Sequence, residues 1–169
     1  THAVDRPEPE TKREMIYLMA INEAQREELE RDPAVIVCGE DVRSNLWGGT
    51  GFARDFGKHR VFDTPLSEVG FVGASLGAAM AGLRPVVDMT IASFLYVAMD
   101  QFVNQAAKSR TMFGGQARLP VTFRTSMMYG MSIGAHHSDR PYPMFMNVPG
   151  LKIIAPASPF DAKGLLKAA

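Results

Sequence analysis

The chain has 169 residues, 46% hydrophobic and 21% charged, which fits one globular domain and excludes disordered, collagen-like and coiled-coil proteins. Eighteen basic residues balance eighteen acidic ones, so no field of one sign favours binding to nucleic acid or to an anionic membrane. The single cysteine, Cys38, favours a reducing, cytoplasmic location, and the longest uncharged apolar run, residues 69–83, is shorter than the roughly 20 residues that cross a bilayer.

The first third of the chain predicts a tail, a helix and a strand. Residues 1–11 carry two prolines and several charges without an apolar period, which predicts a flexible tail. Apolar residues recur at helical spacing over 12–31, and Pro33 ends that helix. The uncharged, β-rich run 34–38 predicts a strand covered on both faces, and a polar loop over 39–58 follows it.

The remaining elements continue an alternation of strands and helices. Ser67 is a candidate N-cap for the helix that follows it. The further predicted strands are 60–62, 85–89, 119–124 and 151–154, and the further predicted helices are 68–82, 94–110 and one from about 158 to 169. This order predicts an α/β fold with a mostly parallel sheet and helices on both faces, spanning residues 12–169.

Common cofactor motifs are missing from the sequence. Gly48, Gly49 and Gly51 lie too far from the strand at 34–38 to form a dinucleotide-binding turn, and the GxxxxGK[ST], HExxH and CxxC patterns do not occur. The sequence therefore disfavours simple Rossmann, P-loop and zinc sites, and it predicts no metal ligands.

A serine hydrolase is one alternative. Residues 73–77 match the nucleophile-elbow pattern GxSxG around Ser75, and Asp88 or Asp100 and then His137 follow in the required order. However, the glycines at 70, 73 and 77 share one face of the predicted helix. That spacing is also typical of a smooth face that lets a helix approach its neighbour closely.

Glu68 and the adjacent pair His136 and His137 each allow a structural or a functional interpretation. Glu68, directly after the N-cap, suits the helix dipole, whereas a functional role requires a buried carboxyl that shares a proton with a ligand. His136 and His137 are adjacent, and on an extended chain they point to opposite sides. At most one of them is expected to face a site.

A collinear set of segments carries a family resemblance. The segments are INEA (21–24), GEDV (39–42), VFDTPLSEVGFVG (61–73), AAMAGLRP (78–85), DQFVNQAA (100–107), His137 with Ser138, VPGLKIIA (148–155) and DAKGL (161–165). Together they resemble the β subunit of the thiamine-diphosphate-dependent decarboxylating component of 2-oxoacid dehydrogenases of the pyruvate and branched-chain type. This region of that family is the pyrimidine-binding domain of the transketolase-like group.

The resemblance implies a set of site residues. Glu68 matches the glutamate that hydrogen-bonds the aminopyrimidine ring of the cofactor, and His137 matches a histidine that assists substrate binding and acyl transfer to lipoyl groups. Phe94 and Leu66 match an aromatic and an apolar contact to the pyrimidine, and Glu40 matches an acidic residue near the cofactor. His136 replaces a glutamine that is usual in the family, and the stretch after His137 also departs from the family pattern.

The resemblance also implies partners. The family continues into the rest of the sheet and a second domain, so the domain is expected to be truncated here. No GDG motif for the magnesium and diphosphate half of the site occurs, so an α subunit is expected to hold Mg²⁺. A lipoyl-bearing acyltransferase and a small 2-oxoacid complete the expected partners. The glycine face and a methionine-rich stretch at 127–146 are expected at subunit contacts, and a non-catalytic interaction module is a third alternative.

Overall fold

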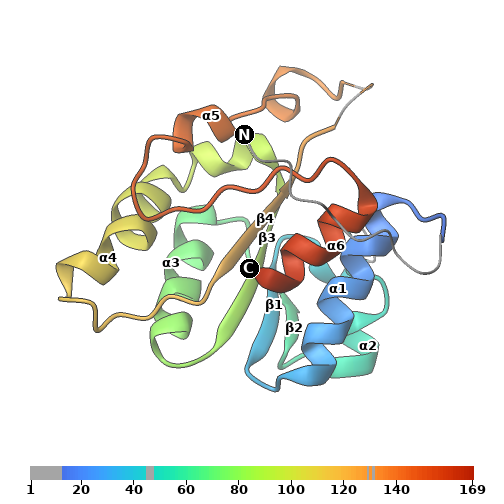
Figure 1. Cartoon of the computed structure of the whole chain (residues 1–169), viewed down its shortest axis with the longest axis horizontal. Coiled ribbons are helices and arrows are strands. Elements are labelled where there is room, and N and C mark those ends of the chain that lie inside the picture. Colours follow the sequence, from blue (N-terminus) through green and yellow to red (C-terminus); the bar gives the residue numbers. More distant parts are fainter. Residues whose placement is uncertain (1–12, 45–47, 129, 131) are drawn as a thin grey trace, which may run out of the picture.

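The computed structural model describes residues 13–44, 48–128, 130 and 132–169. Its centre is a sheet of four strands in the order β2-β1-β3-β4, and every neighbouring pair is parallel. The strands are β1 (Val35–Gly39), β2 (Val61–Asp63), β3 (Arg84–Ile91) and β4 (Thr122–Ser126). Their carboxyl ends therefore lie on one edge, at the upper end of the sheet in Figure 1.

Helices cover both faces of this sheet, as the sequence predicts. Figure 1 shows α3 (Glu68–Met80) and α4 (Ala107–Met112) on one side of the strands, and α1 (Tyr17–Arg31), α2 (Phe52–Phe56) and α6 (Pro159–Ala168) on the other. The short α5 (Tyr142–Phe145) follows the 3₁₀ turn η4 (Ala135–His137) above the carboxyl edge, and η1 (Val42–Ser44) is a further 3₁₀ turn after β1. The predicted α/β fold is confirmed.

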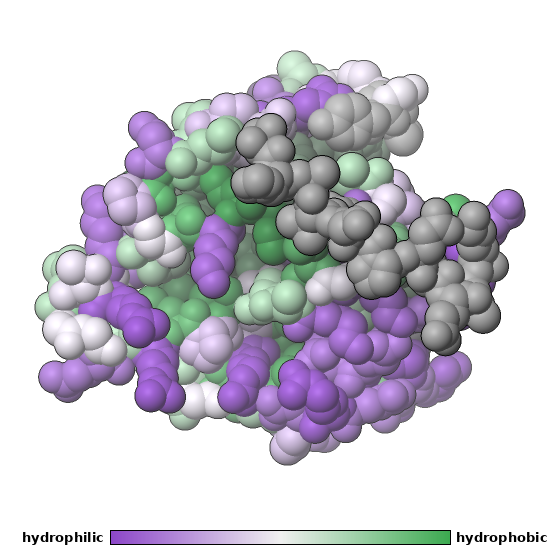
Figure 2. Space-filling view, in the orientation of Figure 1, coloured by the Kyte–Doolittle hydropathy of each residue, from purple (hydrophilic) through white to green (hydrophobic). Residues whose placement is uncertain are grey.

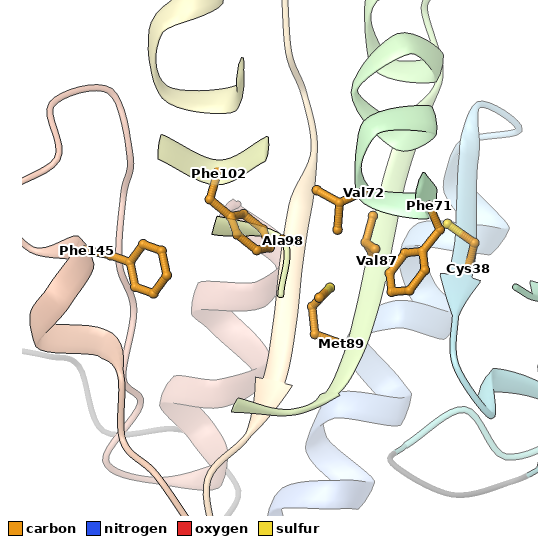
Figure 3. Close-up of a cluster of buried hydrophobic side chains, with 8 residues drawn as sticks. All are labelled: Cys38, Phe71, Val72, Val87, Met89, Ala98, Phe102 and Phe145. Carbon is orange, nitrogen blue, oxygen red and sulfur yellow. The ribbon is translucent and has the colours of Figure 1, made fainter. Parts of the chain in front are cut away.

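Alternation along the strands produces two hydrophobic clusters, one on each face. Val37 pairs with Val61 and Val86 across the sheet and faces Leu29 of α1 and Phe52 of α2. The other face presents Cys38 and Val87 toward α3; the buried members of that cluster, shown in Figure 3, are Cys38, Phe71, Val72, Val87, Met89, Ala98, Phe102 and Phe145. Burial on both faces explains why β1 carries no polar side chain other than the thiol of Cys38, whereas β4 is only partly buried and contains polar residues.

The connection after β3 differs from the continuous helix predicted over 94–110. A 3₁₀ turn, η2 (Ala92–Tyr96), comes first, and helix follows to Met112 with a π-helical stretch, η3 (Gln101–Ala106). The predicted loop over 39–58 also contains the helix α2, and the first helix begins at Tyr17. Residues 1–11, the predicted tail, lie outside the described residues.

The predicted strand at 151–154 is wrong. These residues have no regular secondary structure, and among the described strands β4 pairs only with β3. Leu151 still packs against the large cluster, whereas Ile153 and Ile154 are exposed. The apolar run is real, but a strand also needs a hydrogen-bonded neighbour.

Charged and apolar residues segregate on the surface. Figure 2 shows hydrophilic residues gathered over α1 and the neighbouring lower right of the molecule, and apolar residues around the middle of the view. Lys163 of α6 bridges Glu23 and Glu27 of α1, with Nζ to oxygen distances of 3.1 and 2.6 Å. The first and last helices are therefore held together by ion pairs as well as by packing.

Candidate active site at the carboxyl edge of the sheet

Unpartnered polar atoms gather where the strands end. Among the described residues, a buried side-chain oxygen without a hydrogen-bond partner lies at or just after the end of each strand: Glu40 Oε1 (β1), Thr64 Oγ1 (β2), Ser93 Oγ (β3) and Thr125 Oγ1 (β4). The remaining such atom, Gln25 Oε1, belongs to α1. Buried polar atoms are nearly always paired, and open parallel sheets bind ligands at this edge. This edge is therefore the candidate site.

Glu40 lies at this edge because it directly follows β1. The preceding Gly39 has φ +142°, and a Cβ on it would lie 2.1 Å from the carbonyl oxygen of Asp88 on β3, so only glycine permits this approach of the two strands. Glu40 is 3% exposed. Burial, followed by the negative charges of Glu68, Asp41 and Asp88, raises the pKa of Glu40 to about 7.

Glu68 lies at the same edge, as the first residue of α3, close enough to act electrostatically on Glu40. Its side chain is half-buried, and the helix N-terminus favours a negative charge there. Ser67 occupies the N-cap as predicted, although its side chain accepts no capping hydrogen bond. A Cβ at Gly70 would lie 2.9 Å from Ser67 Oγ, so this glycine leaves room for the serine. Glu40 and Glu68 together can hold and share a proton with a ligand.

Phe94 and His137 form the aromatic part of the site. Their rings meet edge to face with centroids 5.3 Å apart and planes at 82°, and both side chains are half-buried. His136 is exposed. The two histidines lie in the 3₁₀ turn η4 and not on an extended chain, so the alternation expected of an extended chain does not apply, although their exposure differs. Leu66, in the loop before α3, is 85% exposed.

The nucleophile-elbow interpretation of Ser75 is wrong. Ser75 lies inside α3, is 4% exposed, and donates a hydrogen bond to the carbonyl oxygen of Phe71 at 2.8 Å. An elbow requires an exposed serine at a strand-to-helix turn. The candidate acids are engaged elsewhere, since Asp88 pairs with Arg124 and Asp100 accepts a hydrogen bond from Asn104.

Three residues beside the site were missed in this role by the sequence analysis. Asp88 was considered only as a hydrolase acid, and Thr90 and Arg124 were not considered. In the structure, Thr90 Oγ1 donates to the carbonyl oxygen of Glu40 at 3.3 Å, and Asp88 contacts both Thr90 and Arg124. A charged residue inside the apolar segment 85–89 was the available signal.

Metal and membrane features are lacking in the part of the chain that the structure describes. Within residues 13–44, 48–128, 130 and 132–169, no group of three or more histidine, cysteine, aspartate or glutamate side chains could hold a metal ion. None of the helices in those ranges is long and apolar enough to span a membrane.

Comparison with solved structures supports the architecture. The chain is similar to a "split gene transketolase, inactive beta4 tetramer", with a TM-score of 0.72 and 19% sequence identity. The match covers 90% of this chain and 46% of the other. At this identity the likeness concerns the fold alone.

Sequence comparisons are more specific. The chain is 42% identical to an acetoin:2,6-dichlorophenolindophenol oxidoreductase subunit beta of Bacillus subtilis, covering 89% of this chain and 48% of that protein. It is 43% identical to a 2-oxoisovalerate dehydrogenase subunit beta of the same species (92% and 48% covered) and 43% identical to a mitochondrial pyruvate dehydrogenase E1 component subunit beta-1 of Arabidopsis thaliana (93% and 44% covered). The chain thus spans about half the length of these relatives.

The family model described as "Transketolase, pyrimidine binding domain" matches residues 13–169, which include Glu40, Glu68, Phe94 and His137. The chain belongs to this family of transketolase-like pyrimidine-binding domains.

Proposed function

We propose that this chain is the pyrimidine-binding part of a thiamine-diphosphate-dependent β subunit that acts in oxidative decarboxylation of a 2-oxoacid and passes the acyl group to lipoyl groups. The observation that carries the proposal is the pair of carboxyls, Glu40 and Glu68, at the carboxyl edge of the sheet. The names of the relatives support this activity, since they are β subunits of 2-oxoacid and acetoin enzymes.

The residues at the edge fit the aminopyrimidine ring of thiamine diphosphate. Such a ring offers nitrogen acceptors and an exocyclic amino donor, which match carboxyl and hydroxyl groups that lack partners, namely Glu40 Oε1, Ser93 Oγ and Thr125 Oγ1. Phe94 offers an aromatic surface beside them. The cofactor, when bound, supplies a thiazolium carbon that adds to a carbonyl group.

Glu68 holds and moves the proton in this proposal. Its carboxyl, at the N-terminus of α3 and half-buried, would hydrogen-bond a ring nitrogen and hold a proton there. A carboxyl within hydrogen-bond reach of the ring can give and take a proton in each cycle. Glu40, with a pKa of about 7, is a second proton donor or acceptor nearby.

His137 and Phe94 act on the substrate side. His137 is half-buried against Phe94, which fixes its ring plane and leaves its polar atoms to orient the carbonyl group of a substrate. Leu66 and Val69, at 85% and 47% exposed, lie beside Glu68 and would gain apolar contacts with a bound cofactor or a partner.

An α subunit completes the site in this proposal. The described residues hold no candidate metal cluster, so Mg²⁺ and the diphosphate would be held by the partner. On α3, a Cβ at Gly77 would meet no atom within 4 Å, so this part of the glycine face is open and can receive a neighbouring chain. The methionine-rich stretch adds Met144 and Met146, at 54% and 69% exposed.

A second candidate activity is oxidation of acetoin. Two relatives that match at 42% and 43% identity are named for acetoin and come from Bacillus subtilis and Cupriavidus necator. Acetoin also presents a carbonyl carbon for attack, but it lacks the carboxylate of a 2-oxoacid. The proton chemistry assigned to Glu68 is the same for both substrates.

The test is reconstitution of the complete β subunit with an α-type subunit that carries the GDG motif. Magnesium-dependent binding of thiamine diphosphate is measured by calorimetry, and turnover is measured with pyruvate, branched-chain 2-oxoacids and acetoin. We expect binding and turnover of a 2-oxoacid only in the assembled enzyme. Turnover of acetoin alone favours the second candidate. Sub-micromolar binding by this chain alone contradicts the two-subunit arrangement, and binding without turnover of any substrate indicates a non-catalytic module.

A further inference from the structure

A buried ion pair joins the two strands on one side of the candidate site. Asp88 on β3 and Arg124 on β4 are register partners, and their side chains are 3% and 10% exposed. Arg124 Nη1 donates to Asp88 Oδ2. Ionic groups are seldom buried so completely without a structural or functional role.

The other carboxyl oxygen of Asp88 holds an irregularity in β3. Asp88 Oδ1 accepts a hydrogen bond from the backbone N–H of Thr90 at 2.9 Å, and the register with β4 shifts between Asp88 and Ile91. Thr90 has φ +60°, a conformation that is costly for a β-branched residue. The hydrogen bond to Asp88 stabilises this strained bulge.

The bulge connects directly to two residues of the site. Thr90 Oγ1 donates to the carbonyl oxygen of Glu40 at 3.3 Å, which ties β3 to the chain just past the end of β1. Two residues after Thr90 the chain enters η2, which carries Ser93 and Phe94. The conformation of Thr90 therefore sets both the place of Glu40 and the direction in which Phe94 leaves the sheet.

We propose that Asp88, held by Arg124, is a positioning residue that fixes the Thr90 bulge and thereby places Glu40 and Phe94 against the aminopyrimidine ring. This inference rests on the proposed function for the identity of the ligand. The hydrogen bonds from Thr90 to Asp88 and to Glu40, called the tether below, exist in the chain without ligand. Arg124 orients Asp88 and offsets its charge, and Asp88 Oδ1 provides the hydrogen bond on which the bulge depends.

The test compares two double variants in the complete protein, assembled with its α-type partner. Asp88→Leu with Arg124→Met removes both charges and the acceptor for Thr90, and apolar replacement of a buried ion pair commonly preserves folding. Asp88→Asn with Arg124→Met has the same net charge as the leucine variant, but its asparagine retains a carbonyl oxygen that can accept a hydrogen bond from the Thr90 amide. Asp32→Asn is the control, since it breaks the pair between Asp32 and Arg84, whose Nη1 to Oδ2 distance is 2.8 Å, at the other end of β3.

Two readouts separate this inference from the proposed function. Amide hydrogen exchange of Thr90 in the cofactor-free protein should increase in the leucine variant and stay near wild type in the asparagine variant. Thiamine diphosphate affinity should fall by roughly tenfold or more in the leucine variant and stay within about threefold in the other two, the scale typical of losing a group that orients ligand contacts. If wild type binds no thiamine diphosphate, the proposed function fails while the exchange measurement still tests the tether.

A milder pair of variants tests the link to Glu40. Thr90→Ala removes the hydroxyl that donates to Glu40, whereas Thr90→Ser retains it. We expect affinity to fall several-fold in the alanine variant and to be restored by serine. Equal affinities in both double variants, or equal losses in Thr90→Ala and Thr90→Ser, would overturn the inference.

Discussion

Glu68 repels Glu40 across the carboxyl edge of the sheet, and this repulsion adds to burial in raising the pKa of Glu40 to about 7. The two carboxyls come from separate elements, the end of β1 and the start of α3, so the fold itself brings the like charges together. A carboxyl of this kind carries its proton up to neutral pH, where an ordinary glutamate does not.

The first prediction concerns the pH dependence of stability. The folded-state pKa of Glu40, about 7, lies above its usual 4.5, so folding takes up a proton between these values and the stability contributed by protonated Glu40 is lost as pH rises through that window. Glu40→Gln removes the ionisation. We expect the variant to melt higher than wild type at pH 8 but not at pH 5, measured by thermal unfolding. The exposed Glu30→Gln on α1 serves as control, and a pH-independent difference for Glu40→Gln would contradict the prediction.

The second prediction concerns Glu68→Gln in the assembled enzyme. An amide keeps the shape of the carboxyl but cannot transfer its proton, so turnover should fall by roughly 10²- to 10⁴-fold. Folding, followed by circular dichroism, should not change. Ser75→Ala is the control because Ser75 is buried inside α3, and it should retain near wild-type turnover. Full activity of Glu68→Gln would remove this residue from the site.

The third prediction is that the two histidines are unequal. His137 contacts Phe94, whereas His136 is exposed. His137→Ala should reduce acyl transfer to a free lipoyl domain by roughly 10²-fold, as expected for loss of an acid–base group, and His136→Gln should be close to silent. Decarboxylation is assayed separately with an artificial electron acceptor. Similar losses in the two variants would show that the pair acts jointly.

The fourth prediction contrasts two glycines. A Cβ at Gly39 would collide with the Asp88 carbonyl oxygen at 2.1 Å, so Gly39→Ala should destabilise the domain by several kcal/mol or prevent folding. Gly77→Ala meets open space inside a helix and should stabilise the chain alone by about 1 kcal/mol. If α3 contacts the α-type partner, Gly77→Ala should also weaken assembly, which analytical ultracentrifugation measures. Unchanged assembly would place the partner elsewhere.

The fifth prediction concerns the large hydrophobic cluster. Phe102 is 3% exposed, and its ring meets those of Phe123 and Phe145 with centroids 4.8 and 6.0 Å apart (Figure 3 shows Phe102 and Phe145). Phe102→Ala should lower the free energy of unfolding by about 3–5 kcal/mol in denaturant titrations. Phe113→Ala, at a position that is 56% exposed, should change it by less than about 1 kcal/mol. A loss for Phe102→Ala as small as that for Phe113→Ala would show that Phe102 is poorly packed.

The strands and long helices could be predicted because their patterns are local. The apolar segments 34–38 and 85–89 coincide with β1 and the centre of β3, and the boundary of α3 at Glu68 follows from the N-cap position of Ser67. Segment 151–154 has the same apolar pattern but no pairing partner, which no local signal could show. The π-helical stretch η3 was likewise missed; it packs against α3, where Gln101 lies beside Gly73.

The residues of the candidate site were predicted from the family resemblance, and their roles remain predictions. The family resemblance pointed to Glu40, Glu68, Phe94 and His137, and the structure shows the contact between Phe94 and His137 and the electrostatic interaction between Glu40 and Glu68. The sequence could not show that Thr90 adopts a left-handed conformation, because threonine rarely does. The stabilising contact comes from the side chain of Asp88 and depends on tertiary geometry.

The packing of α6 on α1 bears on how the chain folds during synthesis. Lys163 and Lys167 of α6 pair with Glu27 of α1, so a helix made early in translation finds its partner only after most of the domain has been made. Until then, the α6-facing side of α1 is available to chaperones or to a second nascent chain. Contacts between distant parts of a sequence also slow folding. Docking of α6 on α1 is therefore expected late on the folding pathway, after the parallel sheet has formed.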